Sequence, residues 1–187
     1  MNQAALHQLL ASQAKKKGID ELFELRLATN LTLIKDFYLR IYPDGGEKHF
    51  SKLLKTLYQL FAKRPQHLRD QDARRIKNGN WYLSEKMVGM QLYVDHFNKD
   101  LKGLEDKLDY LQDLGITFLH LMPITTRPKG ENDGGYAVNN YTKIDSRYGS
   151  KKELQRLTKK MSEKGMYLML DFVENHTSNE HAWAKKA

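Results

Sequence analysis

The stretch that decides the fold is residues 166–176, which read MYLMLDFVENH. It begins with a continuous apolar run and turns polar at Asp171, Asn175 and His176. This run predicts a strand, and the nearly continuous apolar run at 116–122 before it is typical of parallel strands covered on both faces. Polar side chains directly after such a strand lie at the edge of the sheet where α/β proteins bind their ligands.

Two further strands and two helices are predicted before this stretch. Apolar runs at 88–94 and 116–122 predict the strands, and leucines 101, 104, 108 and 111 predict a helix between them. Gly115 and Gly165 end the two helices, and Ser150 with Glu153 has the spacing of a capping box that opens the second. This order of elements indicates right-handed parallel units. The pattern alone fits an open doubly wound sheet and an eight-stranded barrel equally, and no Gly-x-Gly-x-x-Gly supports dinucleotide binding.

The front part of the chain predicts helices only. Apolar residues recur there at helical spacing, and turns rich in Pro, Gly and Asn separate the segments. The segments are 6–10, 27–41 (which ends on Ile41), 50–61 and 68–76. We therefore predict a helical N-terminal domain over residues 1–85 and an α/β region over residues 86–187.

The net charge of +8 is concentrated in the helical part. Residues 1–85 hold 15 Lys and Arg against 9 Asp and Glu, whereas residues 86–187 hold 16 against 14. The basic clusters lie on helical patterns and lack the aromatic residues that a single-strand nucleic-acid binder places among its cations. We interpret them as solvated helix faces and predict no nucleic-acid partner.

Composition excludes several other classes of protein. The 40% of hydrophobic residues are enough for a packed core, and the absence of cysteine excludes disulfides and thiolate metal sites. No apolar run is long enough to span a bilayer, and the N-terminus lacks the cationic and apolar regions of a secretory signal. We therefore predict a soluble cytoplasmic protein with no membrane partner.

The loop after the second strand contains the sequence Asn132-Asp133-Gly134-Gly135-Tyr136. Its glycines allow a tight turn that brings the Asp133 carboxylate and the Tyr136 ring to one pocket. A carboxylate accepts hydrogen bonds from sugar hydroxyls, and an aromatic ring packs on the apolar face of a pyranose. Taken alone, the same residues also fit an ordinary glycine turn with a buried tyrosine.

The loop after the third strand adds Asp171, Asn175 and His176. A carboxylate at a strand end needs partners, because burial of an unpaired charge is costly. His176 could donate to a sugar hydroxyl, and Asn175 could hold the loop or ligate a cation that prefers oxygen. A capped loop entry with a satisfied histidine is the alternative that these residues leave open.

These segments resemble a known family. Residues 168–176 (LMLDFVENH) resemble the first conserved region of the α-amylase superfamily, glycoside hydrolase family 13. Four further segments resemble the amylosucrase branch of this family: residues 133–141 (DGGYAVNNY), 176–181 (HTSNEH), 81–89 (WYLSEKMVG) and 93–97 (YVDHF). The resemblance is strong over 80–187 and looser over 19–80. It implies an N-terminal all-helical domain followed by the first three strand-helix units of an incomplete (β/α)8 TIM barrel over 86–187.

The resemblance also implies roles for individual residues. Asp133 and Tyr136 would line the subsite for a glucosyl unit, the first through sugar hydroxyls and the second by stacking, and His176 would hydrogen-bond the same unit. Asp171 would be a structural anchor below it. The residue equivalent to Asn175 binds calcium in many α-amylases, but amylosucrases generally do without that ion. We therefore predict structural support from Asn175, no metal and no cofactor.

The residues that would carry out the chemistry are not among those predicted here. A retaining glycosidase needs two carboxylates about 5–5.5 Å apart, one as nucleophile and one as acid/base. In this family they follow the fourth and fifth strands of the barrel, and neither Asp133 nor Asp171 has either role. We therefore expect no catalytic residue within the 187 residues and no activity of the chain alone.

Four functional hypotheses follow. The leading one is the N-terminal part of an amylosucrase-type enzyme, which takes sucrose and passes its glucosyl unit to an α-glucan or to water. Asn140, where many relatives have Asp, fits this branch. The others are an α-amylase-like or sucrose hydrolase of the same family, a non-catalytic carbohydrate-binding remnant, and a basic helical module whose nucleic-acid binding would weaken steeply with salt.

Overall fold

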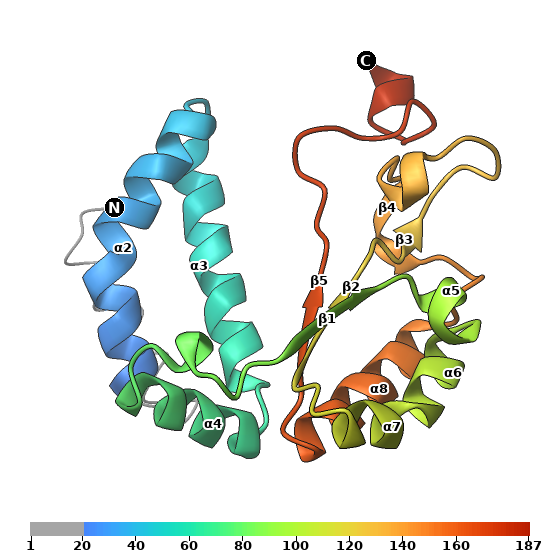
Figure 1. Cartoon of the computed structure of the whole chain (residues 1–187). Coiled ribbons are helices and arrows are strands. Elements are labelled where there is room, and N and C mark those ends of the chain that lie inside the picture. The colour runs from blue at the N-terminus through green and yellow to red at the C-terminus, as the bar shows by residue number, and fades with distance from the viewer. Residues whose placement is uncertain (1–20) are drawn as a thin grey trace. The chain divides into compact units, whose positions relative to one another are not determined.

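The computed structural model describes residues 21–187. The chain divides into two compact units, and the boundary in the sequence lies between Trp81 and Tyr82, slightly before the predicted boundary at residue 85. The assignment of these units to a helical domain over 1–85 and a partial barrel over 86–187 stays a prediction. The helix predicted at 6–10 lies outside the described residues. Figure 1 shows the elements of both units.

Three helices make up the described part of the first unit: α2 (Glu21–Ile41), α3 (Gly46–Ala62) and α4 (Gln66–Lys77). Leu31 of α2 is buried against Phe50, Leu54 and Tyr58 of α3, which confirms the two predicted apolar stripes as the core of this unit. The inward position predicted for Ile41 was wrong, because its side chain is 67% exposed. The cluster between α2 and α3 includes Tyr38 and Phe50 but not Ile41, so the apolar stripe of α2 ends before its last residue.

Turn residues separate these helices as the sequence predicts. Gly45 precedes α3 with φ +66°, a left-handed conformation that costs glycine nothing. Pro65 precedes the first residue of α4, and Asn78 follows its last residue. The ends of these helices are therefore encoded locally.

The second unit contains a parallel sheet of three strands in the order β1-β2-β5. The strands are β1 (Gly89–Leu92), β2 (Phe118–Leu121) and β5 (Tyr167–Leu170). The parallel pairing predicted from the strand–helix alternation is confirmed, although each strand is shorter than its apolar run. Three parallel strands with intervening helices are consistent with the start of a (β/α)8 barrel.

Helices α6, α7 and α8 lie together on one side of this sheet (Figure 1). The helices of this unit are α5 (Val94–Asn98), α6 (Leu101–Asp106), α7 (Leu108–Asp113) and α8 (Lys151–Glu163). The four leucines of the predicted stripe are all buried, but Lys107 divides the predicted single helix into α6 and α7. The capping box of Ser150 and Glu153 is confirmed at the start of α8, and Gly115 and Gly165 have the expected positive φ.

The sequence predicted only a loop between β2 and α8, whereas the structure has a small antiparallel hairpin there. It consists of β3 (Thr125–Thr126) and β4 (Asn140–Ile144), and the short 3-10 helix η2 (Asp133–Gly135) lies between them. A strand of two residues is too short to show an alternating pattern, so the sequence carries no period-2 signal for it. Two further 3-10 turns are η1 (Trp81–Leu83) and η3 (Ala184–Lys186). Between residues 21 and 187, no helix has the length and apolar character needed to cross a membrane.

The helices beside the sheet are joined by a buried carboxylate. The side chain of Glu105 on α6 is 3% exposed, and it accepts hydrogen bonds from Arg156 Nε and Lys160 Nζ of α8, each at 2.6 Å. Burial raises the pKa of Glu105, but the two cations outweigh it and hold that pKa below its usual value. The ion cluster therefore stays charged and connects α6 to α8.

We predict that Glu105→Gln lowers the free energy of unfolding by about 1–2 kcal/mol, because two charge-assisted hydrogen bonds are weakened. Urea unfolding followed by circular dichroism measures the change. Glu163→Gln is the matched control, since Glu163 forms an exposed pair with Lys159 at 3.8 Å and such pairs contribute about 0.5 kcal/mol or less. Equal destabilisation by both variants would contradict the importance of the buried cluster.

Candidate active-site wall

The predicted site residues follow the carboxyl ends of the strands of the parallel sheet. Asp171 comes directly after β5, and its backbone N–H donates to the carbonyl of Leu121 at the end of β2, 3.4 Å away. Tyr93 comes directly after β1. Parallel strands send these ends to one edge, which is where barrel and doubly wound enzymes place their ligands.

Asp171 is held at both carboxylate oxygens. The Tyr136 hydroxyl donates to Oδ2 at 2.6 Å, and His120 Nε2 lies 2.7 Å from Oδ1. Burial raises the pKa of Asp171, but the hydrogen bonds from Tyr136 and His120 outweigh this effect and hold the pKa below its usual value. We call these three residues the Asp171 triad. Asp171 is therefore an ionised acceptor that joins β2, the η2 turn and the loop after β5.

The turn that carries Asp133 and Tyr136 depends on its glycines. Asp133, Gly134 and Gly135 all have positive φ, at 49°, 62° and 101°. A Cβ atom on Gly134 would lie 3.0 Å from the Tyr93 hydroxyl. One on Gly135 would lie 2.9 Å from a guanidinium nitrogen of Arg127, whose side chain is 8% exposed. The predicted tight turn is thus confirmed, and the positive φ of Gly134 and Gly135 makes any residue with a side chain strained there.

The Asp133 carboxylate is open to solvent at this turn. Asp133 is exposed, and its carboxylate makes no hydrogen bond within residues 21–187. Its negative charge reaches Tyr136, where it contributes to the raised pKa of the phenol. An exposed acceptor beside an aromatic ring is the combination that sugar recognition uses.

His176 and Asn175 form a second group in the loop after β5. His176 Nδ1 lies 3.0 Å from Asn175 Oδ1, and the Tyr141 hydroxyl donates to the His176 carbonyl at 2.9 Å. Tyr141 belongs to β4, so this bond joins the hairpin to the loop. Of the predicted residues, the structure brings Tyr136 into contact with Asp171, whereas Asn175 and His176 are neighbours in the chain and His176 has no hydrogen bond to Asp133 or Tyr136 within residues 21–187. We call Asp133, Tyr136 and His176 the candidate sugar wall.

The sequence prediction missed His120 and Tyr93 as neighbours of the site. The signal for His120 was present, because it is the polar residue within the apolar run 116–122. The signal for Tyr93 was weaker, since a tyrosine after a β-prone run is common in strands. Their roles emerge only from the contacts with Asp171 and with Gly134.

The residues described do not gather into a metal site. Within 21–187, no group of three or more His, Asp or Glu side chains could hold a metal ion. Asn175 has its amide oxygen next to His176, which fits a supporting role. The absence of a metal in the functional protein stays a prediction.

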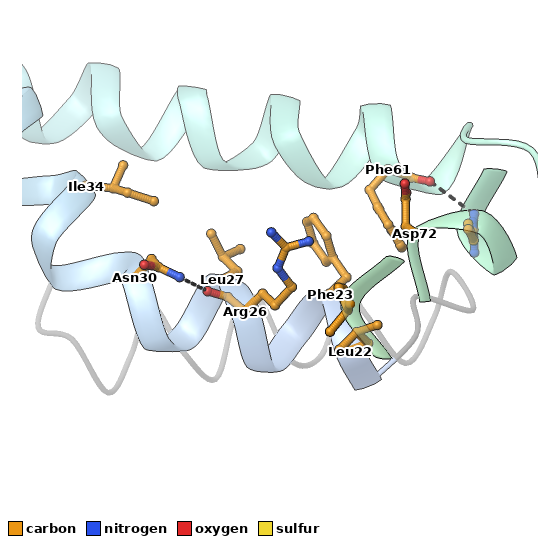
Figure 2. Close-up of a pocket in the computed structure, with 10 residues that line it drawn as sticks. Leu22, Phe23, Arg26, Leu27, Asn30, Ile34, Phe61 and Asp72 are labelled. Carbon is orange, nitrogen blue, oxygen red and sulfur yellow. Dashed lines mark hydrogen bonds between the residues drawn. The ribbon is translucent and has the colours of Figure 1, made fainter. Parts of the chain in front are cut away.

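A separate cavity lies in the helical unit. Its volume is about 290 Å³. Figure 2 shows residues that line it, among them the apolar Phe23, Leu27, Ile34 and Phe61. Its Asp72 is paired with Arg64 through two hydrogen bonds of 2.8 and 3.0 Å. None of the residues of the candidate sugar wall lines it.

Comparison with known proteins decides the family. The family model described as "Alpha amylase, catalytic domain" matches residues 60–187. The chain belongs to this family. Its matched region begins within α3, so it includes α4 of the helical unit as well as the parallel sheet.

Relatives of this α-amylase-family chain include glucosidases and an isomaltulose synthase. It is 42% identical over 106 residues to an oligo-1,6-glucosidase of Heyndrickxia coagulans, covering 53% of this chain and 19% of the relative. It is 44% identical over 115 residues to an α-glucosidase of Schizosaccharomyces pombe, with 58% and 19% covered. The isomaltulose synthase SmuA from Protaminobacter rubrum superposes with a TM-score of 0.51 at 32% identity, covering 58% of this chain and 20% of that one. The chain thus spans about a fifth of the length of these relatives.

We predict that Tyr136 ionises with a pKa of about 12, above the ordinary 10.0, because it donates to ionised Asp171 and is partly buried. The raised pKa means that the Tyr136–Asp171 contact is fully formed below pH 10 and is lost as the pH rises through 12. The absorbance of ionised tyrosine, measured as the difference between the wild type and Tyr136→Phe, isolates this residue. Asp171→Asn should move the Tyr136 pKa down towards its ordinary value, and an unchanged titration in that variant would contradict the assigned cause.

Proposed function

We propose that the chain supplies the first three strands of a (β/α)8 barrel, the helices that connect them, and one wall of its glucosyl-binding pocket. The enzyme it serves would transfer or hydrolyse α-glucosyl units with retention of configuration. Membership of the α-amylase catalytic-domain family and the parallel β1-β2-β5 sheet support this proposal. The helical unit would then precede the barrel, with residues 1–85 and 86–187 as the two domains.

The observation that carries the proposal is the arrangement of Tyr136 and Asp133 at the strand ends. Tyr136 is fixed at its hydroxyl by Asp171, so its ring is held at the edge of the sheet. Asp133 adds an unpaired carboxylate three residues before it. A ring for the apolar face of a pyranose and an acceptor for its hydroxyls are the two elements that a glucosyl subsite needs. His176, in the loop after β5, adds a hydrogen-bonding group to the proposed pocket.

We assign binding rather than bond cleavage to these residues. Both oxygens of Asp171 accept hydrogen bonds from Tyr136 and His120, so we assign this carboxylate to holding those two side chains. Retention requires a nucleophile and an acid/base about 5–5.5 Å apart, and Asp133 alone could not fill both roles. The 187-residue chain is therefore proposed to bind sugar without turnover, and the catalytic carboxylates would stand outside these residues.

Sucrose is the substrate we propose, with an α-glucan as acceptor, as in the amylosucrase type. The resemblance of residues 133–141 and 176–181 to that branch supports the assignment, and Asn140 agrees with it. Among the structural relatives, one MutB variant was crystallised with sucrose as its substrate, which supports sucrose as a ligand of this fold. The second candidate function is a hydrolase of the same family, because glucosidases are among the relatives. The proposal includes no metal, no cofactor and a cytoplasmic location.

We predict that the chain binds sucrose or maltose weakly, with a dissociation constant on the order of millimolar, because only one wall of the pocket contacts the sugar. Titration calorimetry or ligand-observed NMR measures the binding. Tyr136→Ala and Asp133→Ala should each weaken it by about tenfold, which corresponds to the loss of one stacked ring or one charged hydrogen bond.

Tyr110→Ala is the matched control, since Tyr110 is 53% exposed on α7 and should leave binding unchanged. Glycogen and maltose in parallel with sucrose separate the amylosucrase type from a glucan hydrolase. Absence of binding to all three sugars would contradict the proposed wall, and release of glucose or fructose by the chain alone would contradict the assignment of binding without turnover.

A further inference from the structure

His120 is an unusual residue for its position in the sheet. It lies in the central strand β2, in register between Gln91 of β1 and Met169 of β5. Its neighbours Leu119 and Leu121 are completely buried on the helix-covered face, so the alternation of the strand places His120 on the other face. Met169 and Asp171 alternate in the same way, which brings Asp171 to the face on which His120 lies.

The chemistry of the Asp171 triad determines where His120 carries its proton. Ionised Asp171 can only accept hydrogen bonds, and it already accepts one from the Tyr136 hydroxyl at Oδ2. The 2.7 Å contact of Nε2 with Oδ1 is therefore a hydrogen bond only if Nε2 bears the hydrogen. His120 is thus either the neutral Nε2–H tautomer or the imidazolium, and the Nδ1–H tautomer is excluded.

The orientation of Tyr136 depends on this bond through Asp171. A carboxylate bound at one oxygen can still rotate about its Cβ–Cγ bond, whereas one bound at both oxygens is fixed. The Tyr136 backbone is set by the η2 turn, where its N–H donates to the Asp133 carbonyl at 3.0 Å. Its hydroxyl is set by Asp171. Both ends of the ring are therefore fixed only while His120 holds the second oxygen.

We propose that His120 is a positioning residue, which holds the Asp171 carboxylate through Nε2–H so that Asp171 orients the Tyr136 ring for stacking on a sugar. This inference rests on the proposed function, in which the oriented Tyr136 ring binds a sugar. His120 itself is committed to Asp171 and does not contact the sugar. Preorganisation of this kind strengthens binding because the ring needs no ordering when the ligand arrives.

Two variants of the full chain separate the hydrogen bond from the bulk of the side chain. His120→Met keeps an unbranched side chain of similar size without a donor, and His120→Gln places an amide N–H near the position of Nε2. Carbon-13 NMR of the Asp171 carboxyl reports its pKa in each variant. We expect the pKa of Asp171 to rise in His120→Met, because burial is no longer opposed by His120, and to return part of the way in His120→Gln.

Sugar affinity tests the positioning role. We expect His120→Met to bind sucrose or maltose about tenfold more weakly, and His120→Gln to recover most of that loss. Unfolding curves of both variants accompany the measurement, and rescue by Gln despite equal stability of the two variants distinguishes positioning from a general structural effect. Unchanged sugar affinity in His120→Met, together with a raised pKa of Asp171, would overturn the positioning role.

Nitrogen-15 NMR of the wild type tests the proton position directly and needs no ligand. A protonated Nε2 supports the proposal, and an Nδ1–H tautomer overturns it. Failure of the proposed function gives a different result. In that case the wild type binds no sugar, although Nε2 is protonated and the pKa of Asp171 changes in His120→Met.

Discussion

Strand β2 pairs in parallel with β1 on one side and with β5 on the other, and this pairing brings three chain segments to one edge of the sheet. It brings His120 next to Asp171, although the two residues are 51 positions apart in the chain. The buried leucines of α6, α7 and α8 stabilise the pairing, because they cover one face of the sheet. The buried ion cluster around Glu105 then joins α6 to α8 on that face.

The Asp171 triad stabilises a carboxylate charge at this edge of the sheet. A partly buried carboxylate is unfavourable unless donors stabilise its charge. Here a phenol and an imidazole satisfy its two oxygens, and both are drawn from other elements of the unit. The stabilised charge in turn fixes an aromatic ring beside the exposed Asp133. The same interaction therefore serves the packing of the loops and the shape of the candidate sugar wall.

Local sequence was sufficient to predict the three strands of the parallel sheet and the ends of the helices beside it, whereas the binding roles of Asp133, Tyr136 and His176 stay a prediction. Gly115, Gly165 and the Ser150–Glu153 capping box confirm their expected roles, since each depends on its neighbours in the chain alone. Contacts across the sheet were harder to predict. The Tyr136–Asp171 bond joins residues 35 positions apart, and its existence depends on strand register.

Two features differ from the sequence prediction. Ile41 continues the apolar period of α2, but it is exposed and does not belong to the core cluster of α2 and α3. The β3–β4 hairpin was missed because Thr125–Thr126 is too short to show a period, and because the glycine turn between its strands was interpreted only as a loop. His120 had the right signal, a polar residue in an apolar strand, but its partner was defined only by the fold.

A structure of the protein with sucrose or a maltooligosaccharide bound tests the central claim most directly. The claim is that Asp133, Tyr136 and His176 form the surface that receives a glucosyl unit. The predicted result is a pyranose ring in van der Waals contact with Tyr136, with hydroxyls bonded to the Asp133 carboxylate and the His176 imidazole, and with Asp171 still bound to His120 and Tyr136. A sugar bound elsewhere, with Tyr136 and Asp133 facing only solvent, would contradict it.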